Sequence, residues 1–414
     1  MALAVYRRRP SNARSRSNSN DVVMQKSSKP RTMYDCVIVD DRDSETRPSP
    51  RSGHRIVAND GYMYCFGGYN PANPHRFGLF PELWRLCLAT NKWEHMPNEN
   101  CPEETASHSM ILLGSNLFVW GGTGFPFGER CSNTLNCYHL GMQKWHQVPA
   151  GGAIPSARYG QSMTFKDGQL YVIGGTTGYN YSMMVHAMNL ETLVWEDPQA
   201  NRGTYPEWDH YTPEPRYRHE IATSGNLIYV LGGGTAQTVF NFEEIPAFNV
   251  QTNRWTVLTS RPCPVTGTYP PPRKFHAAVQ HKDFVYLCGG FSGQFAMFDD
   301  IWRLSLADLQ WQKLTQRLPR PIYFHSAAVT PEGCMFVFGG VISEKGDCRS
   351  NETFKIWLNV PTLQELVWDS ITTKYHKVLA KHDQDDRDQL TRLGLRLPPK
   401  FFGRLNAKNS GIYK

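Results

Sequence analysis

Arginine is the residue type whose spacing in this sequence is best suited to chemistry. Four arginines each precede a histidine or a glutamine by three residues. They are Arg51, Arg158, Arg216 and Arg273, and Arg218 adds a fifth cation. A guanidinium donates two parallel hydrogen bonds to a carboxylate. If the fold gathers these side chains, they predict a site that binds a carboxylate anion.

A repeated diglycine indicates the elements that must position these arginines. Each diglycine ends a short apolar run, which is typical of a strand buried on both faces. The first glycines are Gly67, Gly121, Gly174, Gly232, Gly289 and Gly339, at intervals of 50 to 58 residues. A repeat of about 50 residues with four short strands predicts a kelch-type β-propeller. We therefore expect an all-β fold of six blades.

Tryptophans mark the fourth strand of five repeats, where we expect them to pack between blades. They are Trp93, Trp145, Trp195, Trp255 and Trp311. The sixth repeat has no such strand, and an open ring would leave an unpaired edge. We expect the segment around 33–40 to close the ring within a propeller that spans 33–360. Residues 1–32 read as a disordered basic tail, and 361–414 as a helical segment.

Equivalent positions in different blades lie on one circle around the central channel. The arginines are expected within the first strand of each blade, which is normally the innermost, so they should ring one mouth of the channel. Nearby acidic residues are few, namely Glu214 and Glu220. The alternative is that the arginines pair with neighbouring blades or with backbone carbonyls. Loops after the diglycines add aromatic walls suited to an extended peptide, among them Tyr69, Phe125 and Tyr179.

Composition limits the class of protein. The 414 residues carry a net charge of +7, much of it in the segment 7–16, which suits either nuclear import or a solvated tail. The ten cysteines contain no C-x-x-C pair, and neither a signal peptide nor a membrane-length apolar stretch is expected. These features favour the cytoplasm or nucleus and no nucleic-acid or membrane partner. The repeated histidines read as structural, so no metal or other cofactor is expected.

The pattern changes to helical after Pro361. Apolar residues at 363, 366, 367, 371, 375, 378 and 379 form a helical stripe. This helix either folds back onto the propeller or docks on another protein.

Several sequence motifs are more specific than the generic kelch repeat, and the resemblance that they support covers about residue 51 to the C-terminus. They include Arg51-Ser-Gly-His54, Phe66-Gly-Gly-Tyr69, Arg216-Tyr-Arg-His-Glu220 and Phe354-Lys-Ile-Trp-Leu358. The chain resembles the kelch-domain-containing substrate receptors of cullin-2 RING ubiquitin ligases, which bind C-terminal degrons. The resemblance implies partners elongin B/C and cullin-2. It also implies an elongin-binding box with Thr362, Leu363, Val367 at a usual cysteine position, and Ile371, followed by a cullin-selecting Leu397-Pro398.

Three functions follow as hypotheses. The first is a non-catalytic substrate receptor, in which the arginines hold the terminal carboxylate of a client. The second is an interaction scaffold that regulates a signalling or cytoskeletal partner without recruiting a ligase. The third and weakest is an enzyme with a tyrosine and histidine copper site, because no nucleophile elbow, P-loop or paired metal motif is present.

Overall fold

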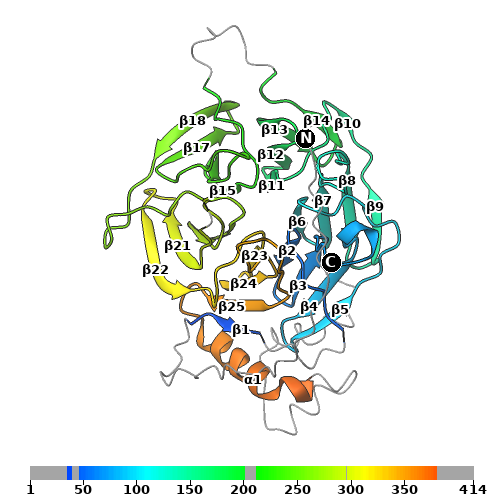
Figure 1. Ribbon diagram of the computed structural model, residues 1–414, viewed down its shortest axis with the longest axis vertical. Coiled ribbons are helices and arrows are strands. Elements are labelled where there is room, and N and C mark those ends of the chain that lie inside the picture. The colour runs from blue at the N-terminus through cyan, green and yellow to red at the C-terminus, as the bar shows by residue number, and fades with distance from the viewer. Residues whose placement is uncertain (1–34, 40–45, 201–210, 295, 380–414) are drawn as a thin grey trace, which may run out of the picture. The chain divides into compact units, whose positions relative to one another are not determined.

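A computed structural model gives the fold and describes all residues except 1–34, 40–45, 201–210, 295 and 380–414. The chain divides into Met1–Met33 and Tyr34–Lys414, and every described residue belongs to the second unit. The predicted tail, 1–32, therefore lies outside the described residues. Tyr34–Lys414 contains six antiparallel sheets around a central channel (Figure 1), so the predicted six-bladed all-β propeller is confirmed.

The innermost strands line the channel, and each contacts the innermost strands of its two neighbours, with β2 against β23 closing the ring. They are β2 (Arg55–Ala58), β6 (Ser109–Leu113), β11 (Ser162–Lys166), β15 (Glu220–Ser224), β19 (Ala277–His281) and β23 (Ser326–Val329). Each begins directly after the histidine or glutamine that recurs in its repeat. The arginine-bearing segments were expected within these strands. They instead precede them, at the channel mouth.

The second strands contain the apolar runs that the sequence assigns to the blade interior. They are β3 (Tyr62–Phe66), β7 (Asn116–Trp120), β12 (Gln169–Thr176), β16 (Leu227–Leu231), β20 (Phe284–Cys288) and β24 (Cys334–Phe338). The diglycine that follows allows close contact with the next blade. A Cβ on Gly67, whose φ is +71°, would lie 2.5 Å from the carbonyl oxygen of Thr105 in the next blade's leading segment.

The third strands pair with the second strands. They are β4 (Leu83–Cys87), β8 (Leu135–His139), β13 (Tyr181–Asn189), β17 (Glu244–Asn249), β21 (Asp300–Ser305) and β25 (Thr353–Trp357). Five blades then continue to a fourth, outermost strand. These strands are β5 (Lys92–His95), β9 (Lys144–Gln147), β14 (Val194–Glu196), β18 (Arg254–Thr259) and β22 (Trp311–Arg317). A short β10 (Gly151–Gly152) adds a parallel partner to β14.

The fourth strand of the sixth blade comes from the start of the described chain. β1 (Val37–Ile38) pairs antiparallel with β25, with Val37 opposite Lys355 and Ile38 opposite Phe354. The amide of Val39 extends this pairing by donating to the carbonyl of Thr353 at 2.9 Å, and its side chain is buried. In Figure 1, β1 lies along the outer edge of the blade that contains β23, β24 and β25.

The five marker tryptophans pack between blades, as the sequence predicts. Each is at least 94% buried in a cluster with residues of the preceding blade, for example Trp195 with Trp120 and Trp93 with Phe338. The part of the chain that the structure describes also contains two helices, the 3-10 turn η1 (Arg76–Gly78) and α1 (Leu363–Leu379). Neither of these described helices is long and apolar enough to cross a membrane.

Candidate functional site: the channel mouth

The four aligned arginines make the same two backbone contacts, each within its own blade. In each, Nη1 donates to the carbonyl of the diglycine's first glycine, with distances from 2.9 to 3.3 Å for Arg51, Arg158, Arg216 and Arg273. In each, Nε donates to the carbonyl two residues upstream, at 2.9 to 3.2 Å. All four side chains are buried. The repeated arginine therefore joins the leading segment of a blade to its diglycine.

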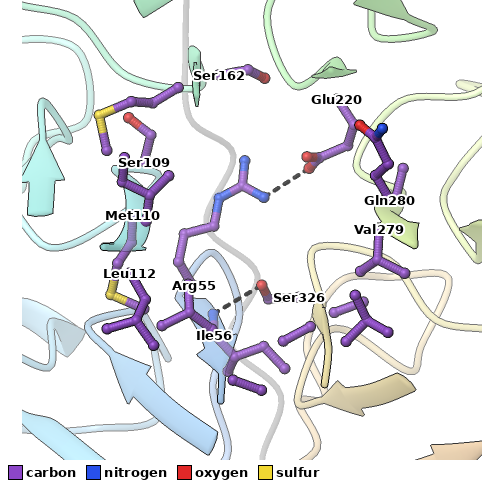
Figure 2. A pocket seen from close by; sticks show the side chains of 18 of the residues that line it. Arg55, Ile56, Ser109, Met110, Leu112, Ser162, Glu220, Val279, Gln280 and Ser326 are labelled. Carbon is purple, nitrogen blue, oxygen red and sulfur yellow. Dashed lines mark hydrogen bonds and ion pairs between the residues drawn. The ribbon is translucent and has the colours of Figure 1, made fainter. Parts of the chain in front are cut away.

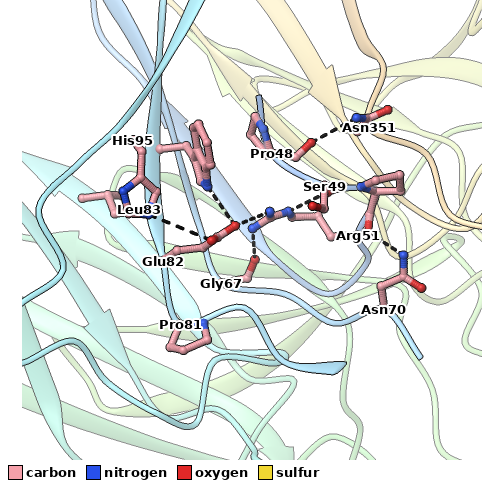
Figure 3. Close-up of polar contacts among 12 residues, drawn as sticks. Pro48, Ser49, Arg51, Gly67, Asn70, Pro81, Glu82, Leu83, His95 and Asn351 are labelled. Carbon is pink, nitrogen blue, oxygen red and sulfur yellow. Dashed lines mark hydrogen bonds and ion pairs between the residues drawn. The ribbon is translucent and has the colours of Figure 1, made fainter. Parts of the chain in front are cut away.

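Two of these arginines are also neutralised by a carboxylate. Arg51 pairs with Glu82 at 2.5 Å (Figure 3), and Arg273 pairs with Asp300 at 2.6 Å. The Arg273 guanidinium holds the pKa of Asp300 below its usual value in spite of burial. The expectation that too few acids exist to pair the arginines is wrong for Arg51 and Arg273, and neither is available to a ligand.

A local sequence signal could have identified these two acids. Each is followed two residues later by a tryptophan, in Glu82-Leu-Trp84 and Asp300-Ile-Trp302. The indole Nε1 of the tryptophan donates to the same carboxylate, at 2.8 Å for Trp84 and 2.7 Å for Trp302. The acid therefore binds both the arginine and the tryptophan of its blade.

Arg158 and Arg216 are held by neutral groups. Arg158 donates from Nη2 to the hydroxyl of Ser156 at 2.7 Å. Arg216 lies over the ring of Phe240 at 3.6 Å. Burial lowers the pKa of both, that of Arg216 to about 10. Both are only 4% exposed, so they serve the blade interior and not an open surface.

A ring of backbone hydrogen bonds surrounds the channel mouth. Its six members occupy the position just before the histidine or glutamine of each repeat, and all have positive φ. They are Gly53, Ser107, Gly160, Arg218, Phe275 and Phe324. The amides of Gly53, Ser107, Gly160, Arg218 and Phe324 each donate to the carbonyl of a ring neighbour at 2.7 to 2.9 Å. We call this set the mouth ring. Among its side chains, one is a cation, Arg218, and two are phenylalanines, Phe275 and Phe324.

Arg218 is the predicted cation that the structure places in the mouth ring. Its guanidinium donates to the hydroxyl of Ser107 and lies 4.7 Å over the ring of Phe324. It is 8% exposed, and its Nε has no hydrogen-bond partner among the described residues. No carboxylate of the described residues forms an ion pair with it. Burial and the neighbouring Arg55 lower its pKa to about 10, so it still carries a positive charge at neutral pH.

Lys274 supplies a second cation beside the mouth ring, and the sequence analysis did not single it out. Its Nζ donates to the carbonyl of Thr235 at 2.6 Å and lies 5.4 Å from the ring centroid of Phe275. Phe275 stacks on Phe324 at 3.9 Å. Burial lowers the pKa of Lys274. The mouth therefore combines two cations with a stacked aromatic pair.

The channel below the mouth ring is crossed by an ion pair. Arg55 of β2 reaches Glu220 of β15 at 2.7 Å (Figure 2), which joins blades on opposite sides of the ring. The cavity around this pair has a volume of about 370 Å³ and is lined by the innermost strands. Glu220 was expected beside the arginines of its own repeat. It instead pairs with Arg55, 165 residues away, a residue that sequence reasoning missed.

The predicted aromatic walls form a connected cluster at the rim of the first two blades. Tyr69 contacts Phe127 with ring centroids 4.8 Å apart, Phe127 contacts Phe125 at 6.0 Å, and Phe125 stacks on Phe77 at 5.6 Å. We call these four residues the rim cluster. Tyr179 of the third blade is 77% exposed.

Comparison with known proteins places the chain in a family. The model of the KLHDC2/KLHL20/DRC7 Kelch-repeats domain matches residues 41–211 and 197–384. Kelch domain-containing protein 10 of Rattus norvegicus is 43% identical over 84% of this chain and 85% of its own length. The human protein of that name is 42% identical over 84% of this chain and 78% of its own. This chain belongs to the Kelch domain-containing protein 10 family. Its Drosophila melanogaster homolog is 39% identical over 87% of this chain and 63% of its own.

In this family member the helix α1 divides its apolar residues between two faces. Trp368 and Ile371 are each 6% exposed and pack on the cluster that contains Tyr62 and Trp145. Leu363 and Val367 are 77% and 47% exposed. The predicted single stripe is therefore wrong: Ile371 faces the propeller and is unavailable to a partner, and the sequence analysis missed Trp368. Leu397 and Pro398 lie outside the described residues.

Two contacts fix how α1 begins and how it lies on the kelch propeller. The amide of Glu365 donates to the hydroxyl of Thr362 at 3.3 Å, which makes Thr362 the N-cap. Asp369 of the helix pairs with Lys355 of β25. The capped helix thus presents Leu363 and Val367 to solvent in a fixed orientation.

The remaining titratable groups do not indicate catalysis. Among the described residues, no group of three His, Cys, Asp or Glu side chains could hold a metal. The repeated histidines are buried, and burial lowers the pKa of His108, His219 and His325 to about 3. As a Kelch propeller of this family, the chain is a protein-interaction module.

Proposed function

We propose that this chain is the substrate-recognition subunit of a cullin-2 elongin RING ubiquitin ligase. In this proposal the propeller binds the C-terminal tail of a client, and α1 recruits the elongin adaptor. The transfer chemistry belongs to partner proteins, so the chain needs no catalytic residue. Membership of the Kelch domain-containing protein 10 family supports an interaction role, and the ligase assignment goes beyond it.

The observation that carries the adaptor half is the exposure of Leu363 and Val367. A large apolar side chain exposed on an ordered helix stays in contact with water, which is unfavourable, unless a partner covers it. The neighbouring Trp368 already anchors the helix to the propeller, so Leu363 and Val367 are not needed for that purpose. Leu363 fits the start of the elongin-binding box, and Val367 is an apolar residue at the position where that box usually has a cysteine, which supports recruitment through this face.

The client half of the proposal rests on Arg218. A guanidinium with an unused donor and no carboxylate partner favours an anion beside it. Among the five arginines predicted to bind a degron, Arg218 is the member of the mouth ring, and Lys274 adds a second positive charge. We therefore propose that Arg218, assisted by Lys274, binds the terminal carboxylate of the client. This replaces the expectation that the whole ring of arginines binds it.

Co-purification from cells tests the adaptor half. The variant Leu363→Ala/Val367→Ala should lose elongin B/C and cullin-2, because it removes the exposed apolar face. The control Gln364→Ala/Ser370→Ala changes exposed residues of the same helix and should keep both partners. Equal recovery of elongins with all three proteins would favour the alternative, a scaffold without ligase recruitment.

Peptide binding tests the client half. Peptides selected from a random library with free carboxyl ends should bind wild type about tenfold or more tightly than their amidated forms. Arg218→Gln should abolish that difference. Lys144→Gln, an exposed change of the same charge, should leave it intact. Indifference of wild type to amidation would contradict capture of a carboxylate.

A further inference from the structure

The rim cluster is an exposed aromatic surface that the fold does not use for its own packing. Phe77 is 72% exposed, Phe125 is 41% exposed and Phe127 is 43% exposed. The rings nevertheless keep ordered contacts, with Phe77 and Phe125 nearly parallel at 11° and Phe127 edge-on to Tyr69 at 82°. Exposed aromatic rings held in one arrangement are typical of a binding surface.

The backbone that presents Phe77 is strained. Arg76 and Phe77 have φ of +49° and +54° in the 3-10 turn η1, a left-handed conformation that disfavours side chains with a Cβ. Hydrogen bonds from the amide of Asn70 to the carbonyl of Gly78, and from the amide of Gly78 to that of His75, hold the turn in place. The strain is not offset by burial of the Phe77 ring. Strain that only exposes an aromatic side chain indicates a functional role.

The rim cluster is continuous with the channel mouth. The backbone of Tyr69 exchanges two hydrogen bonds with Ser52, at 2.8 and 3.0 Å. Ser52 is next to Gly53 of the mouth ring, and a Cβ on Gly53 would lie 3.2 Å from Nη2 of Arg218. The guanidinium of Arg349 lies 5.6 Å from the ring centroid of Tyr69. Direct contacts therefore connect Arg218 through Gly53 and Ser52 to Tyr69, where the rim cluster begins.

We propose that the rim cluster binds a bulky apolar side chain of the client, several residues upstream of the carboxylate at the mouth. This inference rests on the proposed function, which fixes the end of the peptide at Arg218. An extended peptide advances about 3.3 Å per residue, so it covers the three ring-to-ring steps from Tyr69 to Phe77 in about five residues. The apolar side chain should therefore lie about five residues or more before the C-terminus.

The chemistry of the cluster selects the class of side chain. Four aromatic rings offer a large rigid contact area and no carboxylate, so they favour an aromatic or long aliphatic residue. Carboxylate capture alone reads only the last residues of a tail. The rim cluster adds discrimination between tails that share the same end but differ upstream.

Selection from a random peptide library tests this inference. Peptides of about twelve residues with free carboxyl ends, roughly twice the reach of the cluster, are selected on the full chain. We expect enrichment of aromatic or long aliphatic residues about five positions or more before the end. The best binder is then measured by fluorescence anisotropy against wild type and Phe77→Ala/Phe125→Ala. That variant should bind this peptide about tenfold more weakly than wild type does. For a peptide whose upstream apolar residue is replaced by serine, the variant and wild type should have the same affinity.

Matched controls separate the two proposals. Met142→Ala removes an apolar side chain that is 63% exposed elsewhere and should not affect binding, and equal melting temperatures should show that all variants fold. If amidation weakens binding but the cluster variant does not, the proposed function stands and this inference is wrong. If amidation has no effect, or no peptide is enriched, both fail. If the variant instead abolishes self-association of wild type without changing peptide affinity, the cluster joins two copies and the inference is overturned.

Discussion

Arg51 and Arg273 lie in sites from which solvent is excluded. Each is 0% exposed, and its hydrogen bonds go to one carboxylate and two backbone carbonyls. An ionised group can be buried only when it is paired in this way. Arg218 lacks such a carboxylate among the described residues, and this difference in environment supports the separate role proposed for it.

Removal of one partner of the buried pair should destabilise the protein strongly. Asp300→Asn leaves Arg273 charged and unpaired, and also alters the acceptor of the Trp302 indole. We expect a loss of about 3–5 kcal/mol in the free energy of unfolding, measured by urea denaturation. Glu191→Gln changes an exposed carboxylate and should have little effect. A loss for Asp300→Asn no larger than that of the control would contradict a structural role for the pair.

At the scale of the element, the blades were predictable because their signals are local. The apolar run, the diglycine and the tryptophan recur within one repeat, and each has one packing solution between neighbouring blades. Which acid pairs with which arginine was harder to predict from the sequence. Glu82 and Asp300 lie 31 and 27 residues from their arginines, and Arg55 meets Glu220 across the ring. Helix α1 shows the same limit, because its periodicity could not tell which of Leu363, Val367 and Ile371 faces the propeller.

The short strand β1 should contribute more to stability than its two residues suggest. It covers the edge of β25, and it places Val39 in the cluster with Trp93 and Phe338. Deletion of residues 1–41 exposes that edge and removes the buried valine side chain, which alone contributes about 2 kcal/mol. We expect a lower melting temperature, measured by calorimetry, and aggregation, measured by light scattering. Deletion of residues 1–33 retains β1 and should match wild type. Equal melting of both deletions would show that β1 does not stabilise the ring.

At the scale of the whole molecule, buried side chains hydrogen-bond the preceding blade at two junctions of the ring. Nε2 of His54 hydrogen-bonds the carbonyl of Phe338 at 3.1 Å, and Nε2 of Gln161 donates to the carbonyl of Trp120 at 2.9 Å. Both carbonyls belong to the residue before a diglycine in the preceding blade. The glutamine makes the contact without any titratable group. The linkage therefore needs a donor at this position and not a positive charge.

This arrangement predicts a stability that falls in acid. Burial is the main cause that holds the pKa of His54, His108, His219, His276 and His325 below the ordinary value of 6.5. Below pH 6.5 the unfolded chain binds a proton at each of these histidines while the folded chain does not. Stability is therefore fully present above pH 6.5 and declines as the pH falls toward about 3.

Substitution of one linking histidine should reduce this dependence. His54→Gln copies the contact of Gln161 and removes one titrating group, so the slope of unfolding free energy against pH should fall by up to about 1.4 kcal/mol per pH unit. Urea denaturation at several values between pH 4 and pH 7, roughly the window in which the unfolded histidine titrates, measures the slope. His146→Gln removes an exposed histidine and should leave the slope unchanged. If both variants keep the wild-type slope, burial of His54 is not linked to folding, and the acid sensitivity of the ring arises elsewhere.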